Sequence, residues 1–98
     1  QPQGPVILMG DLNAPDDDPL HASIKTAGFT DVWRTANPDA PAEESGTFHN
    51  FTGMADRSRI DYIYATPDLK IVVSAILRSS LNGNYPSDHF PIRATLEW

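Results

Sequence analysis

The sequence predicts a small α+β domain that consists mostly of β-sheet, and three observations lead to this fold class. Residues 5–9 form a short, continuous apolar run of the kind found in strands. Two further runs, at residues 60–65 and 70–78, are rich in β-branched and aromatic side chains. Only residues 18–28 combine helical spacing with clear start and stop signals. We therefore expect one mainly antiparallel sheet with one clear helix.

The first elements follow one another closely. The uninterrupted run at residues 5–9 predicts a strand that is covered on both faces. After a turn-rich loop, Asp18 and Pro19 predict the N-cap and first residue of a helix. Gly28 predicts its end. Between them, apolar side chains recur at helical spacing at Leu20, Ile24 and Ala27.

The middle of the chain carries weaker signals. Residues 29–33 are expected to pack the chain back against the sheet. Residues 36–46 are rich in proline and acidic side chains, which predicts an exposed connection. Residues 47–51 predict a brief strand.

The second half predicts the remaining strands. The runs at 60–65 and 70–78 are joined by a turn at 66–68, and a further turn is expected at 82–84. Residues 92–98 alternate apolar and polar side chains, as a strand with one solvated face does.

Composition sets limits on function. The chain of 98 residues is 40% hydrophobic, enough for one folded domain. It has no cysteine, which excludes disulfides and thiolate metal sites and leaves the compartment open. No run is long enough to span a bilayer, no signal peptide is visible, and the start at Gln1 suggests a piece of a longer protein. The net charge of −6 disfavours tight binding to duplex DNA, although a divalent cation would reverse the local sign at a phosphate site.

Polar side chains at strand ends are the candidate catalytic groups. Asp11 and Asn13 follow the first strand and are two residues apart, so in extended chain both face one side. A carboxylate there can orient or deprotonate water, and an amide can donate to a developing oxyanion. The alternative is an Asx turn, in which the aspartate only caps the loop.

Asp61 lies in an otherwise apolar strand. It can accept the ring N–H of a histidine, fix the tautomer and favour the protonated ring. The alternative is an ion pair with Arg59, which shares its face. Asp88 and His89 are adjacent, so in extended chain their side chains diverge and serve different partners, one a metal and one a phosphate. Their alternatives are a cap for Asp88 and a satisfied packing role for His89.

Together, the motifs Gly-Asp-Leu-Asn at 10–13, Arg-Ile-Asp-Tyr-Ile at 59–63 and Ser-Asp-His at 87–89 resemble the signature of the endonuclease/exonuclease/phosphatase superfamily, which has the deoxyribonuclease-I-like fold. Their order and spacing match the C-terminal half of that family. The Thr-Phe-His block at 47–49 resembles a further block of its bacterial members.

The resemblance implies a role for each motif residue. Asp11 would position or activate the attacking water, and Asn13 would stabilise the phosphoryl transition state. Asp88 would hold Mg²⁺ or Mn²⁺. His89, oriented by Asp61, would contact the scissile phosphate or assist the leaving group. Oxygen ligands of this kind suit a hard divalent cation.

Two features remain open in this interpretation. His49 either binds the substrate, together with Asn13 and His89, or packs beside Phe48 and Phe51. The acidic run at residues 16–18 is expected to be a solvated loop and helix cap.

The chain departs from the family in length. Members have a four-layer α/β sandwich more than twice as long, and their N-terminal half supplies an asparagine and the main glutamate ligand of the metal. We therefore expect residues 1–98 to form a single partial domain whose exposed apolar sheet face needs a partner. We expect this domain to bind Mg²⁺ weakly or not at all in isolation.

Two functions follow as expectations. The first is the C-terminal part of a divalent-metal-dependent phosphodiesterase or phosphomonoesterase, inactive without its N-terminal half. The second is a non-catalytic interaction module that dimerises through the exposed sheet face. The sequence leaves the substrate open between nucleic acid and a small or lipid phosphoester, with a small phosphoester favoured.

Overall fold

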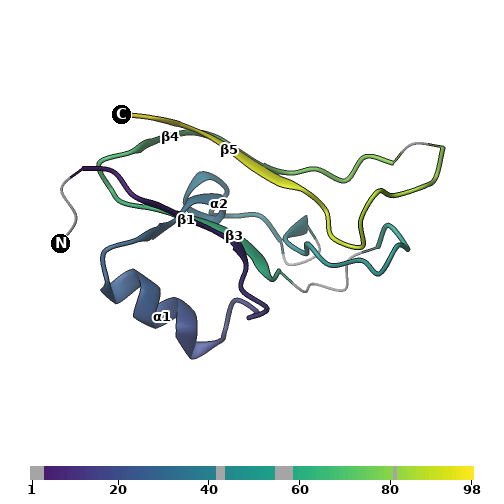
Figure 1. The fold of residues 1–98 in the computed structure, drawn as a ribbon, viewed down its shortest axis with the longest axis horizontal. Helices are drawn as coiled ribbons and strands as arrows, with labels where there is room; N and C mark the ends of the chain where they lie inside the picture. Colours follow the sequence, from purple (N-terminus) through teal and green to yellow (C-terminus); the bar gives the residue numbers. More distant parts are fainter. Residues whose placement is uncertain (1–3, 42–43, 55–58, 81) are drawn as a thin grey trace.

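The computed structural model describes residues 4–41, 44–54, 59–80 and 82–98, and within them the fold is α+β with antiparallel sheets (Figure 1). In chain order the elements are β1 (Ile7–Asp11), α1 (Pro19–Thr26), β2 (Thr30–Asp31), α2 (Val32–Ala36), β3 (Asp61–Ala65), β4 (Lys70–Ile76) and β5 (Ile92–Glu97). None of the described helices is long and apolar enough to cross a membrane.

The strands form two antiparallel sheets. In the first, β3 lies between β1 and β2, and in the second β4 pairs with β5. Figure 1 shows three layers, with α1 below the first sheet and the β4–β5 sheet above it. The register places Asp11 of β1 directly opposite Asp61 of β3. The two central carboxylates of the sequence motifs therefore share one rung of the first sheet.

Alternate side chains of β3 pack against the two neighbouring layers. Ile63 and Ala65 belong to the core, where partly buried apolar residues of β4 and β5, among them Ile71, Ile92 and Leu96, pack against them. Tyr62 and Tyr64 point to the opposite face, as the period of two requires, and their rings contact His21 of α1.

His21 fastens the helix layer to the first sheet. Its Nε2 lies 3.0 Å from the Ala14 carbonyl oxygen and its Nδ1 lies 2.7 Å from the Tyr64 hydroxyl. Because a carbonyl only accepts, Nε2 carries the proton and Nδ1 accepts from the hydroxyl. Burial raises the pKa of Tyr64 to about 12, so this hydroxyl keeps its proton at neutral pH.

Several local predictions are confirmed. Asp18 is the N-cap of α1 and accepts a 2.9 Å hydrogen bond from the Leu20 amide, and Pro19 opens the helix. Gly28 follows the C-cap with a positive φ of 104°, where glycine is unstrained. The chain turns at residues 82–83, and β5 alternates between exposed and half-buried positions.

Other segments differ from the expectation. The segment expected to pack back against the sheet forms β2 and a second helix, α2, whose N-cap Asp31 accepts from the Arg34 amide. Residues 47–51 contribute one isolated bridge, between Phe48 and His89, and no described strand. In the expected exposed connection at 36–46, Ser45 and Gly46 are buried, and residues 42–43 lie outside the described residues.

The expectation that the first strand is covered on both faces is wrong for this chain. β1 is an edge strand, and Ile7, Leu8 and Met9 are 50%, 38% and 64% exposed. Because Met9 and Leu8 point to opposite faces, both faces of β1 lack cover from the described residues. The apolar run predicts a buried strand, but the described residues do not cover it. This agrees with the expected exposed apolar sheet face.

Candidate active site

The centre of the site is a hydrogen bond between Asp61 and His89. The Asp61 Oδ2 atom lies 2.7 Å from the His89 Nδ1 atom. A carboxylate oxygen here accepts the ring N–H, so Nδ1 is the protonated nitrogen and Nε2 faces away from Asp61. The hydrogen bond to Asp61 raises the pKa of His89 above 6.5; burial opposes the shift, and the charges of Asp61, Asp11 and Asp88 add to it.

Asp11 approaches the same histidine from the neighbouring strand. Its Oδ2 atom lies 4.0 Å from the Nε2 atom of His89. One ligand atom from each of Asp11, Asp61 and His89 lies within 4.8 Å of the others. Residues 50 and 78 positions apart in the chain thus converge at the end of the β1–β3 rung, as the sequence motifs predicted.

The Asx turn considered for Asp11 is present as well. Asp11 Oδ1 accepts a 2.8 Å hydrogen bond from the amide of Asn13, whose φ of 48° is left-handed. One carboxylate oxygen thus shapes the loop while the other is nearest His89. The Asx turn is confirmed, and the catalytic role of Asp11 stays a prediction. The left-handed conformation is one that asparagine tolerates better than most residues.

The expected divergence of Asp88 and His89 is not what the structure shows. The Oδ1 atom of Asp88 lies 3.8 Å from the Nε2 atom of His89, so the two side chains approach the same space. The chain bends over residues 86–88 instead of running extended, and the amides of His49 and Asn50 both donate to the Asp88 carbonyl. The bend brings the Asp88 carboxylate to the same Nε2 atom that Asp11 approaches.

Thr47 joins the segments that carry these groups. This fully buried hydroxyl accepts from the amides of Ile60 and Asp61 at 3.0 and 3.2 Å. Its carbonyl accepts from the Phe90 amide at 2.6 Å. The Thr47 side chain therefore fixes the backbone at Asp61, and its main-chain carbonyl fixes the residue that follows His89. Sequence reasoning missed this role, because the hydrogen bonds join segments 13 and 43 positions apart.

His49 lies among aromatic rings. It is 2% exposed, stacks on Phe90 at a centroid distance of 4.2 Å, and its Nδ1 accepts from the Gly53 amide at 3.2 Å. Phe48, its neighbour, has its ring 5.4 Å from that of His89. This position matches the packing alternative, and a contact of His49 with substrate stays a prediction.

Arg59 has partners that the sequence did not suggest. In place of the considered pair with Asp61, its guanidinium forms ion pairs with Asp16 at 2.6 Å and with Asp31. It also lies 4.3 Å from the centre of the Tyr62 ring. Asp16, expected to be only part of a solvated acidic run, is thus fixed by a buried cation. Burial acts to lower the pKa of Arg59, but the hydrogen bonds and charges of Asp31 and Asp16 raise it overall.

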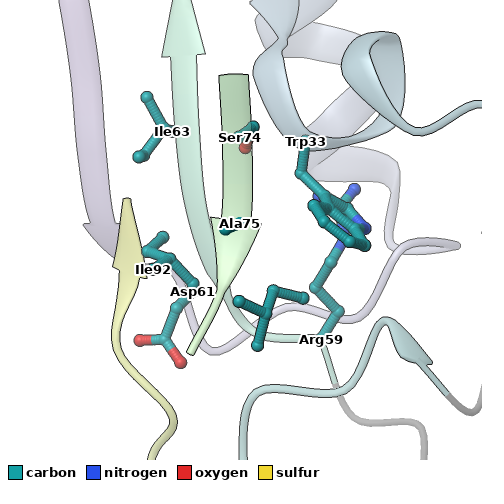
Figure 2. Close-up of a pocket in the computed structure, with 8 residues that line it drawn as sticks. Trp33, Arg59, Asp61, Ile63, Ser74, Ala75 and Ile92 are labelled. Carbon is teal, nitrogen blue, oxygen red and sulfur yellow. The ribbon is translucent and has the colours of Figure 1, made fainter. Parts of the chain in front are cut away.

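Two hollows border Asp61. On the inner side, a narrow cavity between the sheets is lined by Trp33, Arg59 and apolar residues of β3, β4 and β5. Figure 2 shows the Asp61 carboxylate pointing away from Ile63 and Ser74, out of the apolar part of this cavity. On the outer side, a cleft of about 210 Å³ opens beside Asp61 and His89, with Met9, Gly10 and Ser87 in its walls. The carboxylate–imidazole pair is therefore reachable from the cleft.

The donor set fits a divalent cation in chemistry. Asp11 and Asp88 each present a carboxylate oxygen within about 4 Å of the same Nε2 atom, and both side chains are more than 40% exposed. Carboxylate oxygens are the ligands that Mg²⁺ and Mn²⁺ prefer. Asp61 is less available as a ligand, because it already accepts the imidazole N–H.

Comparison with known families decides the classification. The model of the Endonuclease/Exonuclease/phosphatase family matches residues 1–89. The chain belongs to this family. A search of the curated proteins gave no match.

Solved structures agree with the family assignment. A functionally unknown conserved protein from Enterococcus faecalis V583 is 33% identical, with a TM-score of 0.80 over 95% of this chain and 36% of that one. A mannosyl-6-phosphatase from Bacteroides thetaiotaomicron VPI-5482 is 28% identical, with a TM-score of 0.75 over 96% and 38%. A 3′ phosphatase from Neisseria, solved with a product DNA hairpin, is 22% identical, with a TM-score of 0.74 over 98% and 46%, which supports the fold alone.

The chain spans between about a third and a half of the length of these structures. Its three layers are therefore part of a larger family domain, as the resemblance implied. The uncovered faces of β1 are consistent with a further portion that packs on them.

Proposed function

We propose that this chain is the C-terminal part of a divalent-metal-dependent phosphoesterase, which hydrolyses phosphomonoester or phosphodiester bonds and is inactive without its N-terminal portion. The observation that carries the proposal is the convergence of Asp11, Asp61 and His89 within 4.8 Å at one end of the first sheet. Membership of a family with phosphatase and nuclease members supports it.

In this proposal each side chain has a separate task. Asp61 holds the His89 ring and its Nδ1 proton, which leaves Nε2 for a phosphoryl or leaving-group oxygen. Asp11 Oδ1 is occupied by the Asn13 amide, which leaves Oδ2 to orient or deprotonate the attacking water. The side-chain amide of Asn13 would donate to the phosphoryl oxygens as their charge grows.

Asp88 is the residue of this chain that we assign to the metal, and Mg²⁺ or Mn²⁺ is the ion its chemistry fits. When bound, the cation would supply charge neutralisation at the phosphoryl oxygens. The nearby ring of His89 would act on the same oxygens, because its Nε2 lies 3.8 Å from the Asp88 carboxylate.

We favour a small phosphoester as substrate. The net charge of −6 works against a long polyanion, and the cleft of about 210 Å³ beside His89 matches a small group better than a duplex. The sugar-phosphate specificity named for the Bacteroides mannosyl-6-phosphatase, 28% identical to this chain, is compatible with that choice.

The test uses the full-length protein, with the N-terminal portion that its relatives carry. We expect hydrolysis of p-nitrophenyl phosphate or bis-p-nitrophenyl phosphate that requires Mn²⁺ or Mg²⁺. Asp11→Ala should lower kcat at least about a hundredfold, since it removes a proton acceptor. Asp17→Asn, a charge change in an exposed position of the adjacent loop, is the matched control. Equal rates for wild type and Asp11→Ala would end the assignment.

A second function is favoured by the exposed apolar side chains of β1. In this alternative the chain is a non-catalytic module, and a second copy covers that face. It predicts a dimer of the isolated chain by light scattering and no metal-dependent hydrolysis by the full-length protein.

A further inference from the structure

Arg59 forms the centre of a buried cluster of charges just before β3. Its Nε and Nη2 atoms donate to Asp16 Oδ1 at 2.9 and 2.6 Å, and its Nη1 atom donates to Asp31 Oδ1 at 3.0 Å. The side chain is 2% exposed, and Asp31 is 6% exposed. A guanidinium with two carboxylates at these distances is held in one orientation, because its planar fork fixes the direction of every N–H.

The Asp16 carboxylate belongs to the loop that carries Asn13. Upstream of Asn13, the Leu12 amide donates to the Ile60 carbonyl at 2.9 Å. Downstream, Asp16 is bound to Arg59, the residue before Ile60. The loop is therefore fastened on both sides of Asn13 to the two residues that precede Asp61.

Stability alone is a poor account of this cluster. The guanidinium of Arg34 also lies 3.9 Å from Asp16 Oδ2, so the cluster holds two cations and two carboxylates. Even so, buried ion pairs are often no more stabilising than apolar residues of similar volume. Asp16 is about half exposed, which weakens its attraction to Arg59 further. What the cluster does fix is the position of the loop relative to the start of β3.

We propose that Arg59, acting through Asp16, is a positioning residue that sets the Asn13 loop against the Asp61–His89 pair. The inference rests on the proposed function for its catalytic consequence. Arg59 touches neither substrate nor the reacting atoms in this assignment. It acts on the distance between Asn13, which stabilises the transition state, and the imidazole of His89.

The first test compares Asp16→Asn with Asp17→Asn in the full-length protein. Asp16→Asn keeps the shape and removes the charge that Arg59 holds, whereas Asp17 is an exposed neighbour in the same loop. We expect Asp16→Asn to lower kcat about tenfold with KM changed less than about twofold, a smaller loss than an ångström of misplacement gives. Arg59→Lys, which loses the fork, should act in the same direction, and Asp17→Asn should match wild type.

A double-mutant cycle separates positioning from general destabilisation. Asn13→Asp removes the side-chain amide donor and keeps a residue type that tolerates the left-handed backbone. If Asp16 acts through Asn13, then Asp16→Asn should change kcat less than about twofold in the Asn13→Asp background. An equal loss in both backgrounds, or a lower Tm with kcat unchanged, would overturn the proposal.

Amide hydrogen exchange gives a readout that does not depend on activity. The Asn13 amide, which donates to Asp11, should exchange faster in Asp16→Asn than in Asp17→Asn. If wild type lacks hydrolysis that depends on Asp11, the proposed function fails, while faster exchange still supports the role of Arg59 in holding the loop. Unchanged exchange overturns that role whatever the activity.

Discussion

At the scale of single residues, the Asp61–His89 hydrogen bond controls the charge of the site. A raised pKa means that the imidazole stays protonated to a higher pH than a free histidine. Because the pKa of His89 is higher in the folded protein, its interaction with Asp61 stabilises the fold most at low pH. This stabilisation is fully present below pH 6.5, the pKa of histidine in the unfolded chain, and is lost as the pH rises through the pKa of His89 in the folded protein.

Asp61→Asn tests this coupling. The substitution removes the charge that His89 Nδ1–H meets, so the pKa of His89 should fall relative to wild type. Titration of the histidine ring signals by NMR in metal-free protein measures it. Asp68→Asn, an exposed turn position, is the control. A His89 pKa that is unchanged in Asp61→Asn would contradict the hydrogen bond.

Residue types at strand ends predicted most of the candidate site. The remaining contacts join residues far apart in the sequence and could not be predicted from local patterns. Asp11, Asp61 and His89 converge as expected, because β1 pairs with β3 in a register that places Asp11 opposite Asp61. The partners of Arg59 lie 43 and 28 positions away in the chain, which no local pattern reveals. Asp88 and His89 failed to diverge because the chain bends at 86–88.

At the scale of elements, local end signals determine where α1 begins. Asp18 and Pro19 act through contacts within three residues, so the sequence was sufficient to place the helix start. The five-residue helix α2 was missed because it is too short for a periodic pattern and depends on Asp31, which Arg59 also binds.

The N-cap gives a stability prediction for α1. Asp18→Ala should lower the free energy of unfolding of the full-length protein by about 1 kcal/mol, because the Leu20 amide loses its acceptor. Urea unfolding followed by circular dichroism measures the change. Asp17→Ala should shift it by less than about 0.5 kcal/mol. Equal losses in both variants would mean that the cap contributes nothing specific.

At the scale of the whole molecule, the uncovered β1 strand is where further chain is expected to pack. Its apolar run predicted burial on both faces, and the described residues leave it exposed. The apolar run thus fits a strand inside a complete family domain, which extends beyond the part this chain spans.

A charge on β1 should prevent that packing. When residues 1–98 and the N-terminal portion are co-expressed as separate chains, Met9→Glu should reduce their co-purification at least about tenfold, since it places a charge in an apolar contact. Leu20→Glu, a half-exposed apolar position on α1, is the matched control. If Leu20→Glu reduces the yield of complex as much as Met9→Glu, β1 is not the principal contact.

Because Asp11 and Asp61 lie opposite each other, an error in strand register would change the candidate site directly. A slip of β1 by one residue along β3 would turn Asp11 towards the α1 side and bring its neighbour into its place. Under the proposed function, slipped molecules of the full-length protein would then contribute no turnover at all, instead of a slower or less selective one. Preparations that contain them would differ in active fraction, while every working molecule kept the same rate.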